Sequence, residues 1–216
     1  QNDEGRFIAE VVSNGVKDGG SYKDYAVLYR TNAQSRAVEQ AFAKSGIPYR
    51  MLGGMRFFEH AEVKDLIAYL ALINNPNDDL RLRRIINTPR RGIGDKSIQI
   101  AEALAQEEGC QLLEFLRRAK RYTAISSATA NQMVNFVYMM DNFREAAASL
   151  KPSELIELVA EESGYNKMLS EMTDLTERDN RMNNVGELVS AARIYEEGTE
   201  TPSLVEFLED VALVSD

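Results

Sequence analysis

The spacing of hydrophobic residues changes about a quarter of the way along the chain. Before that point lie two short apolar runs, Tyr25–Tyr29 and Pro48–Leu52, bounded by glycine-containing turns. Helical spacing of apolar residues precedes the first run in Glu4–Lys17 and separates the two runs in Asn32–Lys44. A strand, a helix and a strand with short connections predict a βαβ unit with a parallel pair of strands.

From residue 55 onward the pattern is helical. Apolar residues between Val63 and Ile73 predict a long amphipathic helix, which the polar stretch Asn74–Asp78 interrupts. More helices are expected at 80–86, 95–108, 112–119, 126–143, 153–164 and 180–197, and a last one with Thr201 as N-cap and Pro202 at its first position. We therefore expect a mostly α protein. A small, incomplete α/β part at residues 1–75 precedes an all-helical part at residues 76–216.

Charge is distributed unevenly along the chain. The net charge of −9 alone argues against a nucleic-acid partner. However, Pro152–Asp216 holds 16 acidic and 4 basic residues, whereas the first 151 residues hold 18 acidic and 21 basic ones. Within Arg81–Lys96 there are six basic residues and one acid, Asp95. The sequence thus predicts a basic surface near residue 90 and an acidic C-terminal segment.

Several classes of chemistry lack the residues they require. No glycine is followed by lysine, so there is no P-loop to hold nucleotide phosphates. One cysteine, Cys110, and one histidine, His60, exclude an internal disulfide, a zinc site of Cys and His ligands, and a recognisable catalytic triad. No apolar run reaches the roughly 18 residues that span a bilayer. We expect no catalytic residue, metal site or bound cofactor in this chain, no membrane partner, and a cytoplasmic location.

The strongest positive signal is the stretch Asn87–Ser97, NTPRRGIGDKS. A helix is expected to end at Pro89, and two arginines and Gly-Ile-Gly then lead into the next helix. Glycine lets successive backbone amides point outward, and a helix N-terminus adds unpaired N–H groups. Such a helix-hairpin-helix-like turn binds phosphate without reading bases. The alternative is a plain turn between two helices, which the surrounding positive charges disfavour.

Two other clusters carry weaker signals. Arg56, Phe57 and Phe58 follow a glycine turn and could pair with and stack on single-stranded nucleic acid. The alternative is that one of these rings fills the core beneath the following helix. Arg30, Thr31 and Asn32 follow the first predicted strand, where α/β sheets place ligands.

The three clusters together resemble a known family. The stretches DYAVLYRTNAQSR (24–36), YRMLGGMRFFEHAEVKD (49–65) and RIINTPRRGIG (84–94) are similar to the PcrA/UvrD/Rep group of superfamily-one DNA helicases. Glu162–Tyr165 and the ending FLEDVALVSD fit the same group. The resemblance covers essentially the whole chain.

The resemblance implies that the chain is a fragment. Helicases of this group have two RecA-like motor domains, each with a helical insertion. Residues 1–75 would be the start of the second, parallel α/β motor domain, and residues 76–216 its inserted helical subdomain. Arg90–Gly94, hereafter the hairpin, would rest on the duplex ahead of the fork. The expected DNA-binding residues are Thr88, Arg90, Arg91, Gly92, Ile93, Gly94, Lys96, Arg56 and Phe57, with Arg30, Thr31 and Asn32 lining the cleft between motor domains.

The family motifs that build the ATP site are missing from this sequence. The intact bacterial helicase would use ATP and Mg²⁺, move 3′ to 5′ along one strand, and act in DNA repair and replication. The fragment would be its duplex-contacting and regulatory portion, inactive alone. Its partners would be double-stranded DNA through the hairpin, single-stranded DNA, and the remaining helicase domains.

Two other functions remain open from the residues alone. One is a self-sufficient helix-hairpin-helix DNA-binding protein, which the incomplete βαβ start disfavours. The other is a protein-interaction module that acts through the acidic segment 152–216, although that segment also fits a solvated helical surface.

Overall fold

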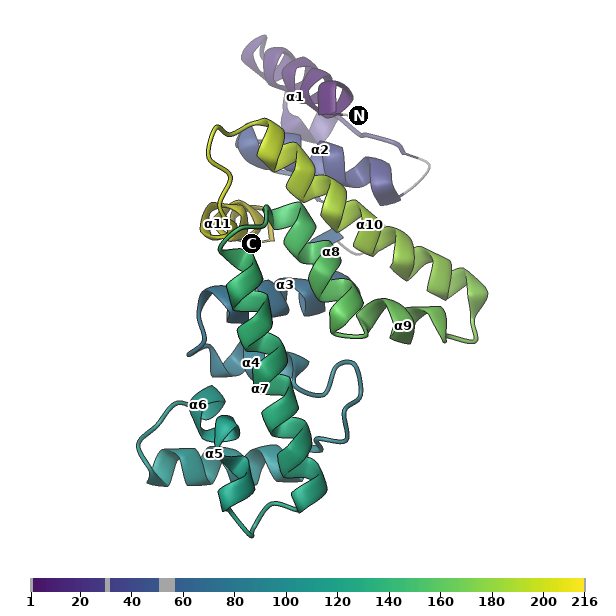
Figure 1. The fold of residues 1–216 in the computed structure, drawn as a ribbon. Helices are drawn as coiled ribbons and strands as arrows, with labels where there is room; N and C mark the ends of the chain where they lie inside the picture. Colours follow the sequence, from purple (N-terminus) through teal and green to yellow (C-terminus); the bar gives the residue numbers. More distant parts are fainter. Residues whose placement is uncertain (1, 30–31, 51–56, 216) are drawn as a thin grey trace. The chain divides into compact units, whose positions relative to one another are not determined.

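A computed structural model describes residues 2–29, 32–50 and 57–215. These residues form helices joined by turns (Figure 1). The α-helices are α1 (Asn2–Lys17), α2 (Asn32–Lys44), α3 (Ala61–Asn74), α4 (Asp79–Ile85), α5 (Asp95–Glu107), α6 (Leu112–Arg117), α7 (Ser127–Ala147), α8 (Pro152–Glu162), α9 (Tyr165–Ser170), α10 (Leu175–Glu197) and α11 (Leu204–Ser215). Short 3-10 turns lie at Tyr22–Asp24 (η1), Phe57–Glu59 (η2) and Ala119–Arg121 (η3). The prediction of a mostly α protein is confirmed.

The predicted strands are absent from the described residues. Tyr25 has extended backbone angles, φ −111° and ψ 138°, but Tyr25–Tyr29 has no strand hydrogen bonding. The second run is likewise irregular as far as Arg50, and its last two residues lie outside the described part. A strand is stabilised by hydrogen bonds to a neighbouring strand, and the described residues of the two runs do not pair with each other. The predicted parallel pair is therefore not seen among the described residues.

The chain divides into two compact units. The first comprises Gln1–Val63 with Glu209–Asp216, and the second comprises Lys64–Leu208. In the first unit, α1 and α2 pack around a small core of Ala9, Val12, Phe42 and Ile47. The helix break predicted at 74–78 is present, since α3 ends at Asn74 and α4 starts at Asp79. The compact units separate at residue 63, inside α3, so the subdomain division at residue 75 stays a prediction.

The helices of the second unit pack through their apolar faces, and several of them begin at a side-chain N-cap. The long helix α7 begins where Ser126 accepts a hydrogen bond from the Thr129 amide at 3.2 Å. It packs against α6 and, further along, against α8, and α8 in turn packs on α10 (Figure 1). These packed helices hold the turn between α4 and α5, because that turn contacts α3 and α7. The fully buried residues of the unit include Leu82, Ile85, Phe115, Leu116, Met133, Phe136, Met140, Ile156, Val159 and Leu188.

Candidate nucleic-acid interface

The hairpin joins two helices of the second unit. α4 ends at Ile85, the Thr88–Pro89 peptide bond is cis, and Gly92 adopts the left-handed conformation at φ +75°. Gly94, at φ −80° and ψ 161°, is the N-cap of α5 and provides no side chain to satisfy the first amides of that helix. The glycine at 92 is required by its positive φ.

Asn87 fixes which amides of the hairpin face the protein. Its side-chain oxygen accepts hydrogen bonds from the amides of Arg91 at 2.8 Å and Ile93 at 3.3 Å. The Ile93 side chain is 1% exposed and anchors the turn in the core. Within the described residues, the amides of Gly92, Gly94, Asp95 and Lys96 have no acceptor. The hairpin therefore directs alternate amides inward and leaves a series of donors unused.

The glycines keep the outer side of the hairpin bare. Gly92 and Gly94 are both exposed, and a Cβ atom added at either would meet no atom within 4 Å. A group as large as a phosphate can therefore approach the unused amides closely. Backbone amides arranged in this way at a helix N-terminus bind anions.

Two cations flank these amides. Arg90 and Lys96 are exposed, and in the part of the chain that the structure describes neither forms a salt bridge. Two arginines of α4 are neutralised: Arg83 pairs with Glu102 at 3.2 Å and Arg84 with Asp65 at 2.8 Å. The carboxylate of exposed Asp95, on the same turn, reduces the local positive potential, so the site holds a modest net positive charge.

Arg91 points inward, unlike its neighbour Arg90. One terminal nitrogen, Nη1, donates to the carbonyls of Ile85 at 3.0 Å and Pro89 at 3.1 Å. The other, Nη2, donates to the Tyr69 hydroxyl at 2.7 Å and to the Ser163 carbonyl at 3.0 Å. The guanidinium carbon also lies 5.5 Å from the centre of the Phe136 ring. Sequence reasoning treated the two arginines as equivalent phosphate contacts, but their surroundings are opposite.

Tyr69 supports the hairpin from α3. Its hydroxyl accepts from Arg91 and donates to the carbonyl of Thr88 at 2.6 Å, so the Thr88 backbone is engaged by the protein. Burial raises the pKa of Tyr69 above its usual value of 10.0, although Arg91 acts in the opposite direction. The phenol therefore stays protonated at neutral pH and keeps the proton that it donates to Thr88.

A second polar link runs through Asp65 of α3. One carboxylate oxygen of Asp65 accepts from Arg84 Nε, and the other accepts from the Tyr165 hydroxyl at 2.7 Å. Tyr165 is 1% exposed and begins α9, directly after the left-handed Gly164 at φ +81°. The turn between α8 and α9 thus contacts the same part of α3 and α4 that supports the hairpin. The sequence marked 162–165 as a family-like stretch without indicating this role.

The other predicted site residues lie in the first unit or outside the described residues. Phe57 is 4% exposed and packs edge-on against Phe58, with ring centres 5.0 Å apart. It therefore presents no open ring face to a base, and the core-filling alternative fits both rings. Arg30, Thr31 and Arg56 lie outside the described residues, and Asn32 begins α2.

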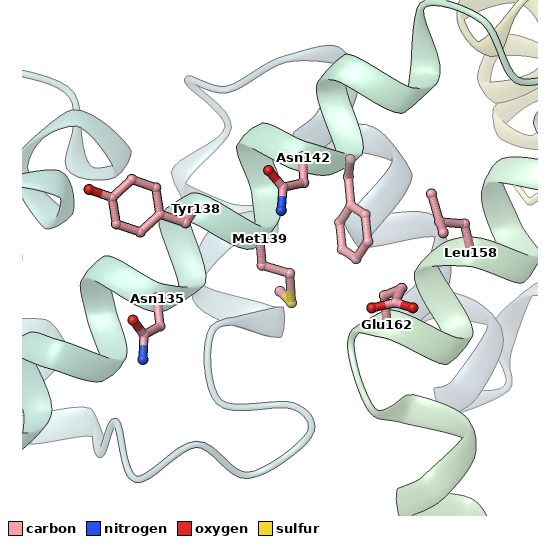
Figure 2. A pocket seen from close by; sticks show the side chains of 7 residues that line it. Asn135, Tyr138, Met139, Asn142, Leu158 and Glu162 are labelled. Atoms are coloured by element: carbon pink, nitrogen blue, oxygen red, sulfur yellow. The ribbon is translucent and has the colours of Figure 1, made fainter.

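A cavity of about 490 Å³ opens between α7 and α8 (Figure 2). Its lining combines polar and apolar side chains, and the sulfur of Met139 lies 4.0 Å from Nη2 of Arg91. The cavity therefore borders the support of the hairpin. It is lined by Asn135, Tyr138, Met139, Asn142, Phe143, Leu158 and Glu162. Among the described residues, no helix is long and apolar enough to cross a bilayer, and no three His, Cys, Asp or Glu residues gather as a metal site would require.

Comparison with known proteins gives one consistent result. The family described as UvrD-like helicase C-terminal domain matches residues 1–216. The chain is 37% identical over 218 residues to proteins named ATP-dependent DNA helicase PcrA from Staphylococcus aureus and Staphylococcus epidermidis. Each alignment covers 100% of this chain and 30% of the relative. The chain thus spans less than a third of the length of the curated relatives it matches.

Proposed function

Because this chain belongs to the family of UvrD-like helicase C-terminal domains, we propose that it is the duplex-contacting portion of an ATP-dependent DNA helicase. In this proposal, α4, the hairpin and α5 act as a helix-hairpin-helix-like element that holds the phosphate backbone of double-stranded DNA. ATP hydrolysis with Mg²⁺, 3′ to 5′ movement, and a role in DNA repair and replication belong to the whole protein.

The observation that carries the proposal is the bare outer side of the hairpin. The unused amides of Gly92 and Gly94, the start of α5, and the unpaired charges of Arg90 and Lys96 lie within seven consecutive residues. Amides and cations suit phosphate oxygens, whose positions do not depend on base sequence. The hairpin should therefore bind duplexes of any sequence, weakly, because the chain as a whole carries a net charge of −9.

Salt-dependent titration of duplex DNA tests the proposal. Arg90→Ala should weaken binding to duplexes of unrelated sequence by the same factor, and the slope of log K against log salt should fall by about 1, the amount expected for one lost phosphate contact. Arg121→Ala is the matched control, because Arg121 is an exposed arginine of η3 whose side chain has no partner among the described residues. The control should leave both affinity and slope unchanged.

Two results would contradict the proposal. Equal affinity and slope for Arg90→Ala and the unaltered chain would remove the hairpin as the site. The acidic segment 152–216 would then be the first place to seek a protein partner instead. A purified chain that releases phosphate from ATP in the presence of DNA, after a control for contaminants, would contradict the assignment of ATP chemistry to the rest of the helicase.

A further inference from the structure

Arg91 lies in the hairpin, but its side chain is hydrogen-bonded to the protein interior. Its Nη atoms donate to protein acceptors on four segments: the end of α4, Pro89 just before the hairpin, α3 and the end of α8. Met139 and Phe136 of α7 cover the same guanidinium. We infer that Arg91 is a positioning residue that holds the hairpin against α3 and the α8–α9 turn, and that it does not contact DNA. The inference rests on the proposed duplex-binding function.

The contacts explain how the protein accommodates a half-buried positive charge. No carboxylate lies among the partners of Arg91 in the described residues; they are carbonyls, a hydroxyl, a thioether sulfur and aromatic rings. Ile85 is the last residue of α4 and Ser163 is the C-cap of α8. The carbonyl ends of helices carry partial negative charge, so two helix ends stabilise one cation.

The geometry requires arginine rather than any cation. A guanidinium presents several N–H groups in one plane, and here they reach acceptors 2, 6, 22 and 72 residues away in sequence. A lysine ammonium is a compact charge with three donors and cannot reach all of these acceptors together. A phosphate contact, in contrast, tolerates lysine. This difference separates positioning from direct DNA contact.

The α8–α9 turn supplies the far end of this support. The Ser163 carbonyl accepts from Arg91, and two residues later the Tyr165 hydroxyl reaches Asp65, which holds Arg84 of α4. Gly164, at φ +81°, allows the chain to reverse between these two contacts. The turn therefore fixes the hairpin at its end and, through Asp65, fixes the helix that leads into it.

The test compares lysine at positions 91 and 121. In the DNA-free protein, Arg91→Lys should speed hydrogen exchange of the two hydrogen-bonded hairpin amides, those of residue 91 and Ile93, by roughly tenfold to a hundredfold, the loss expected for hydrogen bonds to a charged group. It should also weaken duplex binding by about tenfold or more with little change in the salt slope. Arg121→Lys, which makes the same substitution at an exposed arginine of η3 outside the hairpin, should stay within about twofold of the unaltered protein in all three measurements.

Tyr69→Phe provides a milder second variant, since it removes one hydroxyl and no charge. It should produce a smaller change of the same kind, and its effect should shrink when Arg91 is already lysine, because both changes break the same contact. Protection of α10 amides reports whether each variant remains folded. Unchanged hairpin exchange and duplex affinity in Arg91→Lys would overturn the inference. The exchange measurement uses no DNA, so it stands even if the unaltered chain fails to bind duplex, which would contradict only the proposed function.

Discussion

The two compact units differ in how completely they bury their apolar side chains. In the second unit, Phe115 and Leu188 are 0% exposed and the helices enclose a continuous core. In the first unit, Phe7 is 65% exposed and Leu28 is 95% exposed, although both belong to apolar runs. The same hydrophobic pattern can therefore belong to a buried core or to an exposed apolar surface, and periodicity alone does not distinguish the two.

The difference also bears on function. The second unit has the packing needed to hold a binding turn rigidly, and it carries the hairpin. The first unit carries predicted strands without the neighbours that would complete a sheet. We therefore treat the second unit as the DNA-binding scaffold, and the following experiments test its contrast with the first unit.

Hydrogen exchange should show the largest contrast. Amides within α7 and α10 should exchange only through extensive unfolding, whereas those of Tyr25–Tyr29 lack strand hydrogen bonds and should exchange through small local openings. We expect rates that differ by about 10⁴-fold or more. Comparable protection in Tyr25–Tyr29 would mean that another chain, such as a second copy, completes the sheet, and the contrast would then fail.

Truncating one phenylalanine in each unit gives the next largest contrast. Phe115→Ala should lower the free energy of unfolding by about 3–5 kcal/mol, because the ring is fully buried and its removal leaves a cavity. Phe7→Ala should change it by no more than about 0.5 kcal/mol, as expected for an exposed residue. Urea unfolding followed by circular dichroism measures both. A cost at Phe7 as large as that at Phe115 would show that Phe7 is covered in solution.

The same glycine change should have opposite signs in the two units. A Cβ at Gly5 of α1 would overlap the backbone carbonyl of Ala37 in α2, so Gly5→Ala should destabilise the first unit by about 1–3 kcal/mol. A Cβ at Gly186 of α10 would meet nothing within 4 Å, so Gly186→Ala should stabilise the second unit by about 0.5–1 kcal/mol. Thermal unfolding of the two variants measures the signs. A stabilising Gly5→Ala would contradict the close α1–α2 packing.

A charge at the start of α4 gives the smallest expected effect. Burial raises the pKa of Asp79, and the carboxylates of Glu102 and Asp78 raise it further. Because the pKa is raised in the folded state, protonation of Asp79 favours folding, and this contribution is fully present below the usual Asp pKa of about 3.9. The contribution is lost as the pH rises through the raised pKa. Asp79→Asn should therefore be slightly more stable at neutral pH, by less than about 0.5 kcal/mol. The gain should disappear under acidic conditions; a gain independent of pH would contradict the assignment.

Local signals in the sequence predicted much of the helical structure. The predicted helix starts at residues 126 and 95 are confirmed, since Ser126 is the N-cap of α7 and Asp95 is the first residue of α5. The predicted start of the later helix at residue 180 is wrong by five residues, because α10 begins at Leu175. The side chain of Asp174 accepts a hydrogen bond from the Glu177 amide at 3.0 Å and caps this helix. An acid followed three residues later by glutamate is a sequence pattern that predicts such an N-cap.

The long-range structure was less accessible. The apolar run Tyr25–Tyr29, with two tyrosines and one valine, predicts a strand by composition, but a strand also needs a partner that the described residues do not supply. The inward direction of Arg91 depends on Tyr69, Met139 and Ser163, which lie 22, 48 and 72 residues away. No local pattern distinguishes it from Arg90. The glycines and the basic residues were thus enough to predict where the hairpin lies. The different roles of its two arginines became visible only in the tertiary structure.

In the proposed function, the second unit presents the outer side of the hairpin to duplex DNA. Backbone amide resonances recorded during titration with two short duplexes of unrelated sequence test this contact residue by residue. We expect the largest shifts on Gly92, Gly94, Asp95 and Lys96, equal for both duplexes and smaller as salt is added. Shifts confined to α1 and α2 of the first unit, or a hairpin response to only one of the two sequences, would contradict it.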